Sequence, residues 1–356
     1  MDNDPEAHDD YVNLKFLGPI SVERHVKPLP VLMNSNYILL IGLTGAGKSN
    51  FLEALSGRKD LKISGDSLES VTQEVTVYKL VNVQFKVFGE PIFLIDCPGF
   101  CDTKTSEFKM IKLLQKWTHP LQGKHLGIQT SRTIDTIFYF HRITDKRLSS
   151  TQKDTLRLIK AMVGDQHRME TQLVVVTTMW DTLWRPDQIQ EAEKRFAQLR
   201  ESLNEILGTA TEHTLRFENT QKSALRVIDQ AEETSTPYGI RGNMRRGINS
   251  PPFRMFYREK MGKAPFAMQL LQFLNTRIGT LTETIRMLDN DIRGIELDDE
   301  SNKSERDELV GMRKTAEEAL RVVMDEQMEL LALQERAQAR PNFARRVIGY
   351  MHNKLS

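Results

Sequence analysis

Short apolar runs, each ending in glycine or polar residues, mark the first half of the chain. They occupy residues 37–41, 92–95, 136–140 and 172–177. Runs of this length without polar alternation are typical of strands buried on both faces of a parallel sheet. The stretch 50–55 has helical apolar spacing instead. The pattern predicts an α/β domain with a mostly parallel sheet and helices on both faces.

A different pattern, with apolar residues at alternating spacings of three and four, governs residues 266–340. The first seam comprises Leu271, Leu274, Ile278, Leu281, Ile285, Leu288, Ile292 and Ile295. After an acidic stretch at 297–302, a second seam comprises Leu309, Met312, Ala316, Ala319, Val323, Leu330 and Leu333, with Glu326 as an interruption. Such seams are typical of coiled coils. We expect an antiparallel helical hairpin, with self-association through the same seams as the alternative.

The composition is that of an ordinary globular protein, with nearly balanced positive and negative charges. The chain has 356 residues and a formal net charge of +1, so we predict no specific nucleic-acid binding. We find no apolar run of the ~20 residues that a membrane span needs, and the N-terminus is acidic. The two cysteines, Cys97 and Cys101, are too few for a disulfide framework. We therefore expect a cytoplasmic protein with reduced thiols.

The first apolar run leads into GLTGAGKS, residues 42–49, which fits the G-x(4)-G-K-[ST] phosphate-binding pattern at every fixed position. Glycines at this spacing let backbone N–H groups approach phosphates, at the positive end of the helix that follows. Lys48 is expected to reach the β and γ phosphates, and Ser49 to hold Mg²⁺. The predicted nucleotide contacts are Thr44, Gly45, Ala46, Gly47, Lys48, Ser49 and Asn50.

The second apolar run ends in Asp96-Cys97-Pro98-Gly99, an Asp-x-Pro-Gly sequence behind the phosphate-binding pattern. This order matches the metal-binding motif of GTPases. Asp96 is predicted to hold Mg²⁺, and the Gly99 N–H to sense the γ-phosphate.

The fourth run continues into Thr178-Met179-Trp180-Asp181, where GTPases carry the base-reading [NT]-K-x-D motif. Asp181 can accept hydrogen bonds from N1–H and the N2 amino group of guanine, a pair that adenine lacks. Thr178 is the second predicted base contact. Met179 replaces the usual lysine, although its unbranched stem can also pack over a base.

Two further segments complete the predicted nucleotide site. The polar stretch 64–76 is expected to be the first switch, with Thr72 as the threonine that completes the Mg²⁺ shell and Thr76 as the second candidate. Thr72, Lys48 and Gly99 are the residues predicted to act on the reacting phosphate. A loop over the base is predicted at 217–220, where an exposed helix start is an equal alternative.

These motifs together resemble the septin-like GTPases, and most closely the immunity-associated (GIMAP-like) G-domain proteins. The resemblance covers residues 34–230, and its specific carriers are GLTGAGKS, the run 70–72, DCPGFCDT at 96–103 and TTMWD at 177–181. It implies a P-loop G domain that binds GTP or GDP with Mg²⁺ and hydrolyses GTP. It also implies self-association, either through the nucleotide face or through the coiled coil.

Phe100 bears on the rate of that hydrolysis, because it follows Gly99 where Ras-like enzymes have a water-orienting glutamine. An aromatic side chain cannot orient water, so we expect slow intrinsic turnover, stimulated by pairing. His141, Arg142, Lys146 and Arg147 are cationic candidates near the expected pairing face, with a solvated loop as the alternative. A scaffold with a catalytically weak G domain and an ATP-using P-loop NTPase remain alternative functions.

Segments of distinct composition flank the predicted domains. Residues 1–33 form an acidic segment that we expect to be partly disordered. Residues 231–265 form a basic linker or excursion with glycine and proline, and 266–340 the hairpin. Residues 341–356 form a basic tail with an apolar stripe, for which peripheral membrane contact is one reading and packing on the protein the other.

Overall fold

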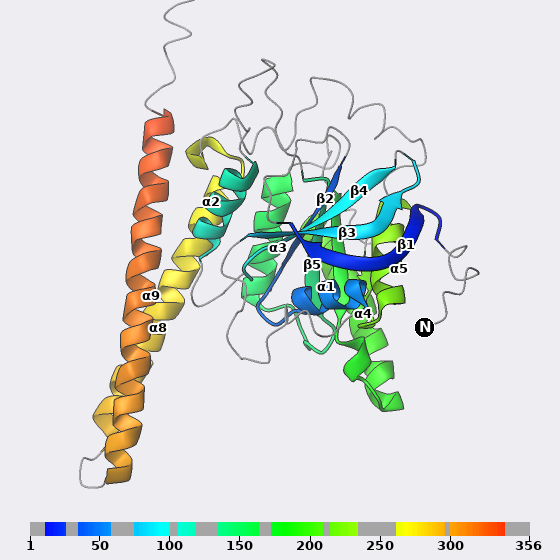
Figure 1. Ribbon diagram of the computed structural model, residues 1–356. Helices are drawn as coiled ribbons and strands as arrows, with labels where there is room; N and C mark the ends of the chain where they lie inside the picture. The colour runs from blue at the N-terminus through cyan, green and yellow to red at the C-terminus, as the bar shows by residue number, and fades with distance from the viewer. Residues whose placement is uncertain are drawn as a thin grey trace, which may run out of the picture. The chain divides into compact units, whose positions relative to one another are not determined.

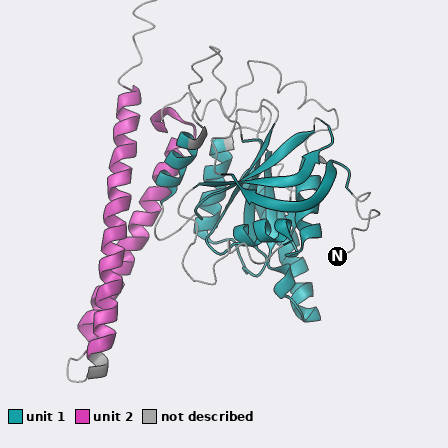
Figure 2. Ribbon diagram, viewed as in Figure 1, with its two compact units in different colours: residues 1–257 teal, residues 258–356 magenta. Residues whose placement is uncertain are grey.

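The structure is a computed structural model that describes residues 11–25, 35–57, 75–87, 89–99, 106–118, 134–163, 172–208, 214–233, 261–295 and 300–338. The chain divides into two compact units, Met1–Tyr257 and Arg258–Ser356 (Figure 2). Each unit is described by itself.

Unit 1 is built on a seven-stranded sheet with strand order β1-β3-β4-β2-β5-β6-β7 (Figure 1). The strands are β1 (Leu14–Arg24), β2 (Asn36–Gly42), β3 (Thr76–Phe85), β4 (Glu90–Asp96), β5 (Thr136–Arg142), β6 (Gln172–Thr178) and β7 (Thr214–Arg216). Neighbouring strands from β4 to β7 run parallel, whereas β3 and β1 add antiparallel strands at one edge. The prediction of a mostly parallel α/β sheet is confirmed.

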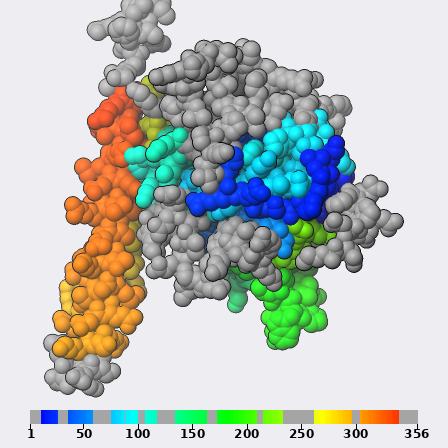
Figure 3. All heavy atoms as spheres, viewed as in Figure 1, coloured from blue at the N-terminus to red at the C-terminus, as the bar shows by residue number. Residues whose placement is uncertain are grey.

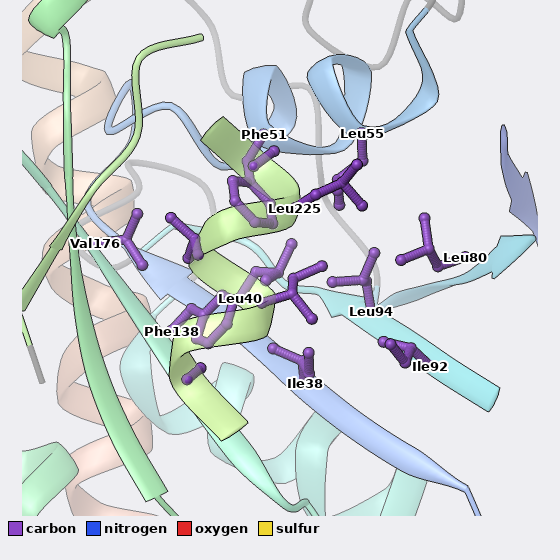
Figure 4. Close-up of a cluster of buried hydrophobic side chains, with 14 of the residues drawn as sticks. Ile38, Leu40, Phe51, Leu55, Leu80, Ile92, Leu94, Phe138, Val176 and Leu225 are labelled. Atoms are coloured by element: carbon purple, nitrogen blue, oxygen red, sulfur yellow. The ribbon is translucent and has the colours of Figure 1, made fainter. Parts of the chain in front are cut away.

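Helices alternate with most of the strands along the chain, because parallel neighbours need crossover connections of about a dozen residues or more. They are α1 (Lys48–Ser56), α2 (Glu107–Thr118), α3 (Ser150–Val163), α4 (Pro186–Leu207) and α5 (Gln221–Glu233). One buried cluster joins α1 and α5 to one face of the sheet, with Phe51 and Leu225 over Leu40, Leu94 and Phe138 (Figure 4). Phe51 meets the rings of Phe138 and Phe140 edge to face.

The alternate strand residues point to the opposite face of the sheet, because side chains in a strand have a period of two. Leu39, Ile95, Ile137 and Val175 belong to this second set, and each is at most 1% exposed. Strands that are buried on both faces explain the continuous apolar runs in the sequence.

The prediction that residues 1–33 are an acidic, partly disordered segment outside the domain is wrong for residues 14–24. These residues form β1, which pairs with β3 and lies at the surface beside it (Figure 3). The strand has no continuous apolar run, because its side chains differ in burial: Leu17 is 57% exposed and Leu14 only 1%. The register shifts opposite Asn82, which adopts a φ of 61° and donates from Nδ2 to the Pro19 carbonyl (2.6 Å).

A buried carboxylate fixes the beginning of β1 to helix α5. Asp229 of α5 accepts hydrogen bonds from the backbone N–H groups of Val12 (3.0 Å), Asn13 (2.7 Å) and Leu14 (2.9 Å). The Asn13 side chain donates in return to the Asp229 carbonyl (2.9 Å). Four hydrogen bonds thus join segments more than 200 positions apart in the sequence.

Unit 2 contains the short 3₁₀ helix η5 (Met261–Lys263) and two long helices, α8 (Ala267–Gly294) and α9 (Glu300–Gln338). The helices are antiparallel, since Asp289 pairs with Arg313 (2.6 Å) and Asn275 accepts from Gln327. Their buried positions include Leu274, Leu288, Ala316, Val323 and Leu330. The predicted antiparallel hairpin is confirmed, although Met312 of its second seam is 53% exposed.

Several sequence-based predictions concern residues outside the described part of the chain. These include Thr72 and most of the first switch, Phe100, Cys101, residues 241–260 and the basic tail 341–356. Among the described residues, no helix is both long enough and apolar enough to cross a membrane.

Candidate functional site

The phosphate loop, residues 42–49, joins the carboxyl end of β2 to the amino end of α1. Gly45 and Gly47 adopt φ values of 75° and 92°, a left-handed region that favours glycine. A side chain at Gly42 would bring its Cβ within 2.7 Å of the Phe140 carbonyl oxygen on the neighbouring strand β5. The glycine pattern in the sequence therefore has a backbone reason at each of these three positions.

Lys48, the first residue of α1, lies inside the phosphate loop rather than at the surface. It is 7% exposed, and its Nζ donates to the carbonyls of Gly42 (3.3 Å) and Leu43 (3.2 Å). Thr44, Gly45 and Asn50 are exposed, and Ser49 is half-buried. The loop thus presents a buried ammonium group, a half-buried hydroxyl and the first turn of a helix at one place.

The metal loop, residues 96–99, follows β4 and packs against the phosphate loop. A Cβ at Gly99 would lie 2.7 Å from Thr44 Oγ1 and 2.8 Å from the Thr44 nitrogen, so only glycine fits this contact. Asp96 is 1% exposed at the end of β4, whose neighbour β2 carries the phosphate loop. The predicted metal and phosphate residues therefore meet at the carboxyl ends of adjacent parallel strands.

Cys97, between Asp96 and Pro98, is fully buried. Burial raises the pKa of its thiol well above the usual range; the Asp96 charge raises it further, and the Lys48 charge lowers it. A thiol with a raised pKa is a poor nucleophile, so Cys97 is a structural residue.

The base loop, residues 177–182, extends β6 into the 3₁₀ turn η3 (Trp180–Thr182). The Thr178 hydroxyl donates to the carbonyl of Ala46 (3.0 Å), which ties this loop to the phosphate loop, and it also lies 3.4 Å from the His141 carbonyl. Met179 turns the chain with a φ of 65°. The exposed Asp181 carboxylate then accepts a hydrogen bond from Asn219 Nδ2 (2.9 Å).

These three loops lie at one end of the sheet, and the segment that carries them resembles a known protein family. The model of the 50S ribosome-binding GTPase family matches residues 37–205. This span begins at β2 and includes the phosphate, metal and base loops. Residues 37–205 are therefore similar to the domain of this GTPase family.

One curated protein to which the chain is similar is Translocase of chloroplast 33 of Arabidopsis thaliana. The chain is 25% identical to it over 143 residues, which is 40% of this chain and 42% of the relative. The similarity therefore spans less than half of either protein.

Solved structures of similar proteins include one described as showing that dimerisation is important for the GTPase activity of atToc33 and psToc159. It has 17% identity and a TM-score of 0.41, and the match covers 58% of this chain and 84% of that chain. Another is Toc33 from Arabidopsis thaliana with Mg²⁺ and GMPPNP, with 18% identity, a TM-score of 0.40, and coverage of 56% and 86%.

Next to the base loop lies a histidine that the sequence suggested as a cation. His141 is the next-to-last residue of β5 and is 4% exposed, with Gln152 Nε2 3.5 Å from its Nδ1. Burial lowers its pKa to about 4; the Asp145 carboxylate raises the pKa and Arg142 lowers it, both by less than burial does. His141 is therefore neutral at pH 7, and its prediction as a cationic group is wrong. Arg142 pairs with Asp145 (3.1 Å).

The 217–220 segment contains the helix start that the sequence offered as one of two alternatives. Thr220 caps the start of α5, because its hydroxyl accepts from the Ser223 N–H (3.1 Å). The Ser223 hydroxyl accepts in turn from the backbone N–H groups of Glu218 (3.1 Å) and Thr220 (3.3 Å). Asn219, with a φ of 55°, reaches Asp181 of the base loop. The segment is thus a helix start whose preceding residue contacts the base loop.

The sequence did not predict the residues that pack against the base loop. Arg216 of β7 lies against the rings of Trp180 and Phe196, with its guanidinium carbon 4.5 Å from each ring centroid. No motif covers this position, because β7 is three residues long and half-exposed. Within the described residues, no cluster of three or more His, Cys, Asp or Glu side chains could hold a metal by itself.

Proposed function

We propose that this chain is a Mg²⁺-dependent guanine-nucleotide-binding switch protein that hydrolyses GTP slowly. The observation that carries the proposal is the physical link between the phosphate and base loops. The Thr178–Ala46 hydrogen bond (3.0 Å) joins the two loops, and Asn219 orients the Asp181 carboxylate beside them (2.9 Å). A nucleotide whose phosphates and base are both recognised needs these loops at a fixed separation.

The phosphate loop fits a triphosphate by its own chemistry. Its glycines open the backbone toward an anion, its helix start adds positive potential, and Lys48 supplies a full charge. Ser49 and Asp96 are the oxygen ligands that would hold Mg²⁺, with Thr72 as the third. Bound Mg²⁺ would neutralise charge on the phosphate oxygens, while Lys48 and the Gly99 N–H would contact the γ-phosphate.

Asp181 selects guanine in this proposal. Its carboxylate accepts only, so it matches the N1–H and N2 amino donors of guanine and repels the ring acceptor that adenine presents. Thr178 was predicted to contact the base as well. Because its buried hydroxyl donates to carbonyls of the protein, we assign it to supporting the loop.

The slow rate follows from Phe100, which cannot orient a water molecule as glutamine does. A second subunit that supplies a cation across the nucleotide face would raise the rate. Lys146 and Arg147 are exposed in the loop after β5 and are the candidates for this role.

Competition binding tests the proposal. Fluorescent GDP is titrated into the full-length protein with Mg²⁺ and displaced with GDP, GTP or ATP. We expect guanine nucleotides to compete at least about a hundredfold better than ATP, because Asp181 leaves adenine unpaired. Equal competition by ATP would contradict guanine selection and favour a general NTPase. No binding of any nucleotide would favour a coiled-coil scaffold.

Turnover at rising protein concentration tests the hydrolysis proposal. We expect the rate per molecule to be low when the protein is dilute and to increase with concentration. The double variant Lys146→Ala/Arg147→Ala should lose that increase but keep its GDP affinity. Fast hydrolysis that is independent of concentration would contradict slow intrinsic turnover.

A further inference from the structure

Arg216 contacts three side chains beside the base loop, those of Glu193, Trp180 and Phe196. Its two terminal nitrogens donate to the two carboxylate oxygens of Glu193 on α4 at 2.6 and 2.5 Å, a bidentate pair. Its planar guanidinium carbon lies 4.5 Å from the ring centroids of both Trp180 and Phe196. Arg216 thus ties β7, α4 and the base loop to one another.

Trp180 is the part of the base loop that this arrangement holds. Its indole Nε1 donates to the Thr177 hydroxyl (3.0 Å), which itself donates to the Leu215 carbonyl (2.9 Å). Its ring also meets the Phe196 ring, with centroids 5.8 Å apart. Trp180 is directly followed by Asp181, so the orientation of the indole sets the start of the turn that carries the carboxylate.

The base loop has a specific need for such support. Met179 occupies the position where the base-reading motif carries lysine, and a thioether offers neither an N–H donor nor a charge. Thr178 holds the loop to the phosphate loop on one side. On the other side, the cation that contacts the loop belongs to Arg216, thirty-seven positions after Met179 in the sequence.

We propose that Arg216 is a positioning residue for guanine recognition, which acts through Trp180 on the placement of Asp181. The inference rests on the proposed guanine-binding function and deepens it. It predicts that guanine selectivity depends on a side chain that does not touch the base.

Inosine diphosphate provides a probe for this dependence, because it lacks only the N2 amino group of guanine. The ratio of IDP to GDP dissociation constants therefore reports the contact between Asp181 and N2. For Arg216→Gln in the full-length protein, we expect this ratio to fall about tenfold, within the range of couplings between residues in contact. Arg216→Lys should restore little of it, since an ammonium group cannot form the bidentate pair or stack on rings.

A matched control and a double variant separate positioning from general destabilisation. Arg157→Gln removes another surface arginine that pairs with an aspartate at 2.7 Å, on α3, and should leave the IDP/GDP ratio unchanged. In the Asp181→Asn background, Arg216→Gln should have no further effect on the ratio, because the contact it positions is already lost.

Three outcomes decide the matter. A fall in the ratio that disappears in the Asp181→Asn background supports the proposal. A lowered melting temperature with an unchanged ratio overturns it and leaves Arg216 a structural residue. Failure of the wild-type protein to bind GDP overturns the proposed function and, with it, this inference, and so differs from a failure of Arg216 alone.

Discussion

At the scale of the residue, His141 shows how burial changes chemistry. Because its pKa is lowered to about 4 in the folded protein, it stays neutral where an unfolded histidine takes up a proton near pH 6.5. The unfolded state therefore binds more protons between these values. We expect the contribution of His141 to the free energy of unfolding to be fully present above pH 6.5. It should decrease by up to about 3 kcal/mol as the pH falls toward 4.

Urea unfolding of wild-type protein and of His141→Gln across pH 4 to 7.5 measures this contribution. Carboxylates titrate in both proteins, so the difference between the two curves isolates the histidine. The wild type should lose stability more steeply than the variant below pH 6.5. Parallel curves would contradict a depressed pKa for His141.

At the scale of the element, Asp229 is the residue that secures β1 to α5. Its replacement by alanine removes the acceptor of three backbone N–H groups, those of Val12, Asn13 and Leu14. Lost acceptors in a buried setting cost about 1–3 kcal/mol each when water cannot replace them. We expect Asp229→Ala to destabilise unit 1 by about 2–4 kcal/mol in urea unfolding.

Asp154→Ala is the matched control for the Asp229 prediction. Asp154 forms a salt bridge with Arg157 on α3 (2.7 Å), but both side chains are partly exposed. Its loss should cost less than about 1 kcal/mol. If the two variants lost the same small amount of stability, the anchoring role of Asp229 would be wrong.

The elements also show what the sequence could and could not predict. Parallel strands buried on both faces were predictable because their apolar runs are continuous, and the phosphate loop was predictable because glycine is required at fixed positions. β1 escaped prediction because it is an edge strand with exposed Leu17 and a register shift opposite Asn82. Arg216 escaped because its role depends on Trp180 and Glu193, which only the folded chain brings to it.

At the scale of the whole molecule, the residues predicted to bind nucleotide all belong to unit 1, while the hairpin seam belongs to unit 2. Leu330 is fully buried in α9. The substitution Leu330→Ala should therefore destabilise the hairpin by about 2–5 kcal/mol. The neighbouring Leu331 is 39% exposed, and its alanine variant should cost less than about 1 kcal/mol.

Helical circular dichroism in urea reports the hairpin, and fluorescent GDP reports the nucleotide site of the same samples. We expect Leu330→Ala to shift the helical transition while the GDP dissociation constant stays within about twofold of the wild type. A tenfold weaker affinity would show that nucleotide binding depends on unit 2.

The most direct test of guanine recognition exchanges the hydrogen-bonding pattern of Asp181. Xanthine carries a carbonyl where guanine has the N2 amino group, so an asparagine amide can donate to it while a carboxylate cannot. The measurement is the ratio of XDP to GDP dissociation constants with Mg²⁺, in the wild type and in Asp181→Asn. We predict that the wild type prefers GDP by about a hundredfold or more and that the variant prefers XDP. The same ratio in both proteins would contradict the assignment of Asp181 as the residue that reads the base.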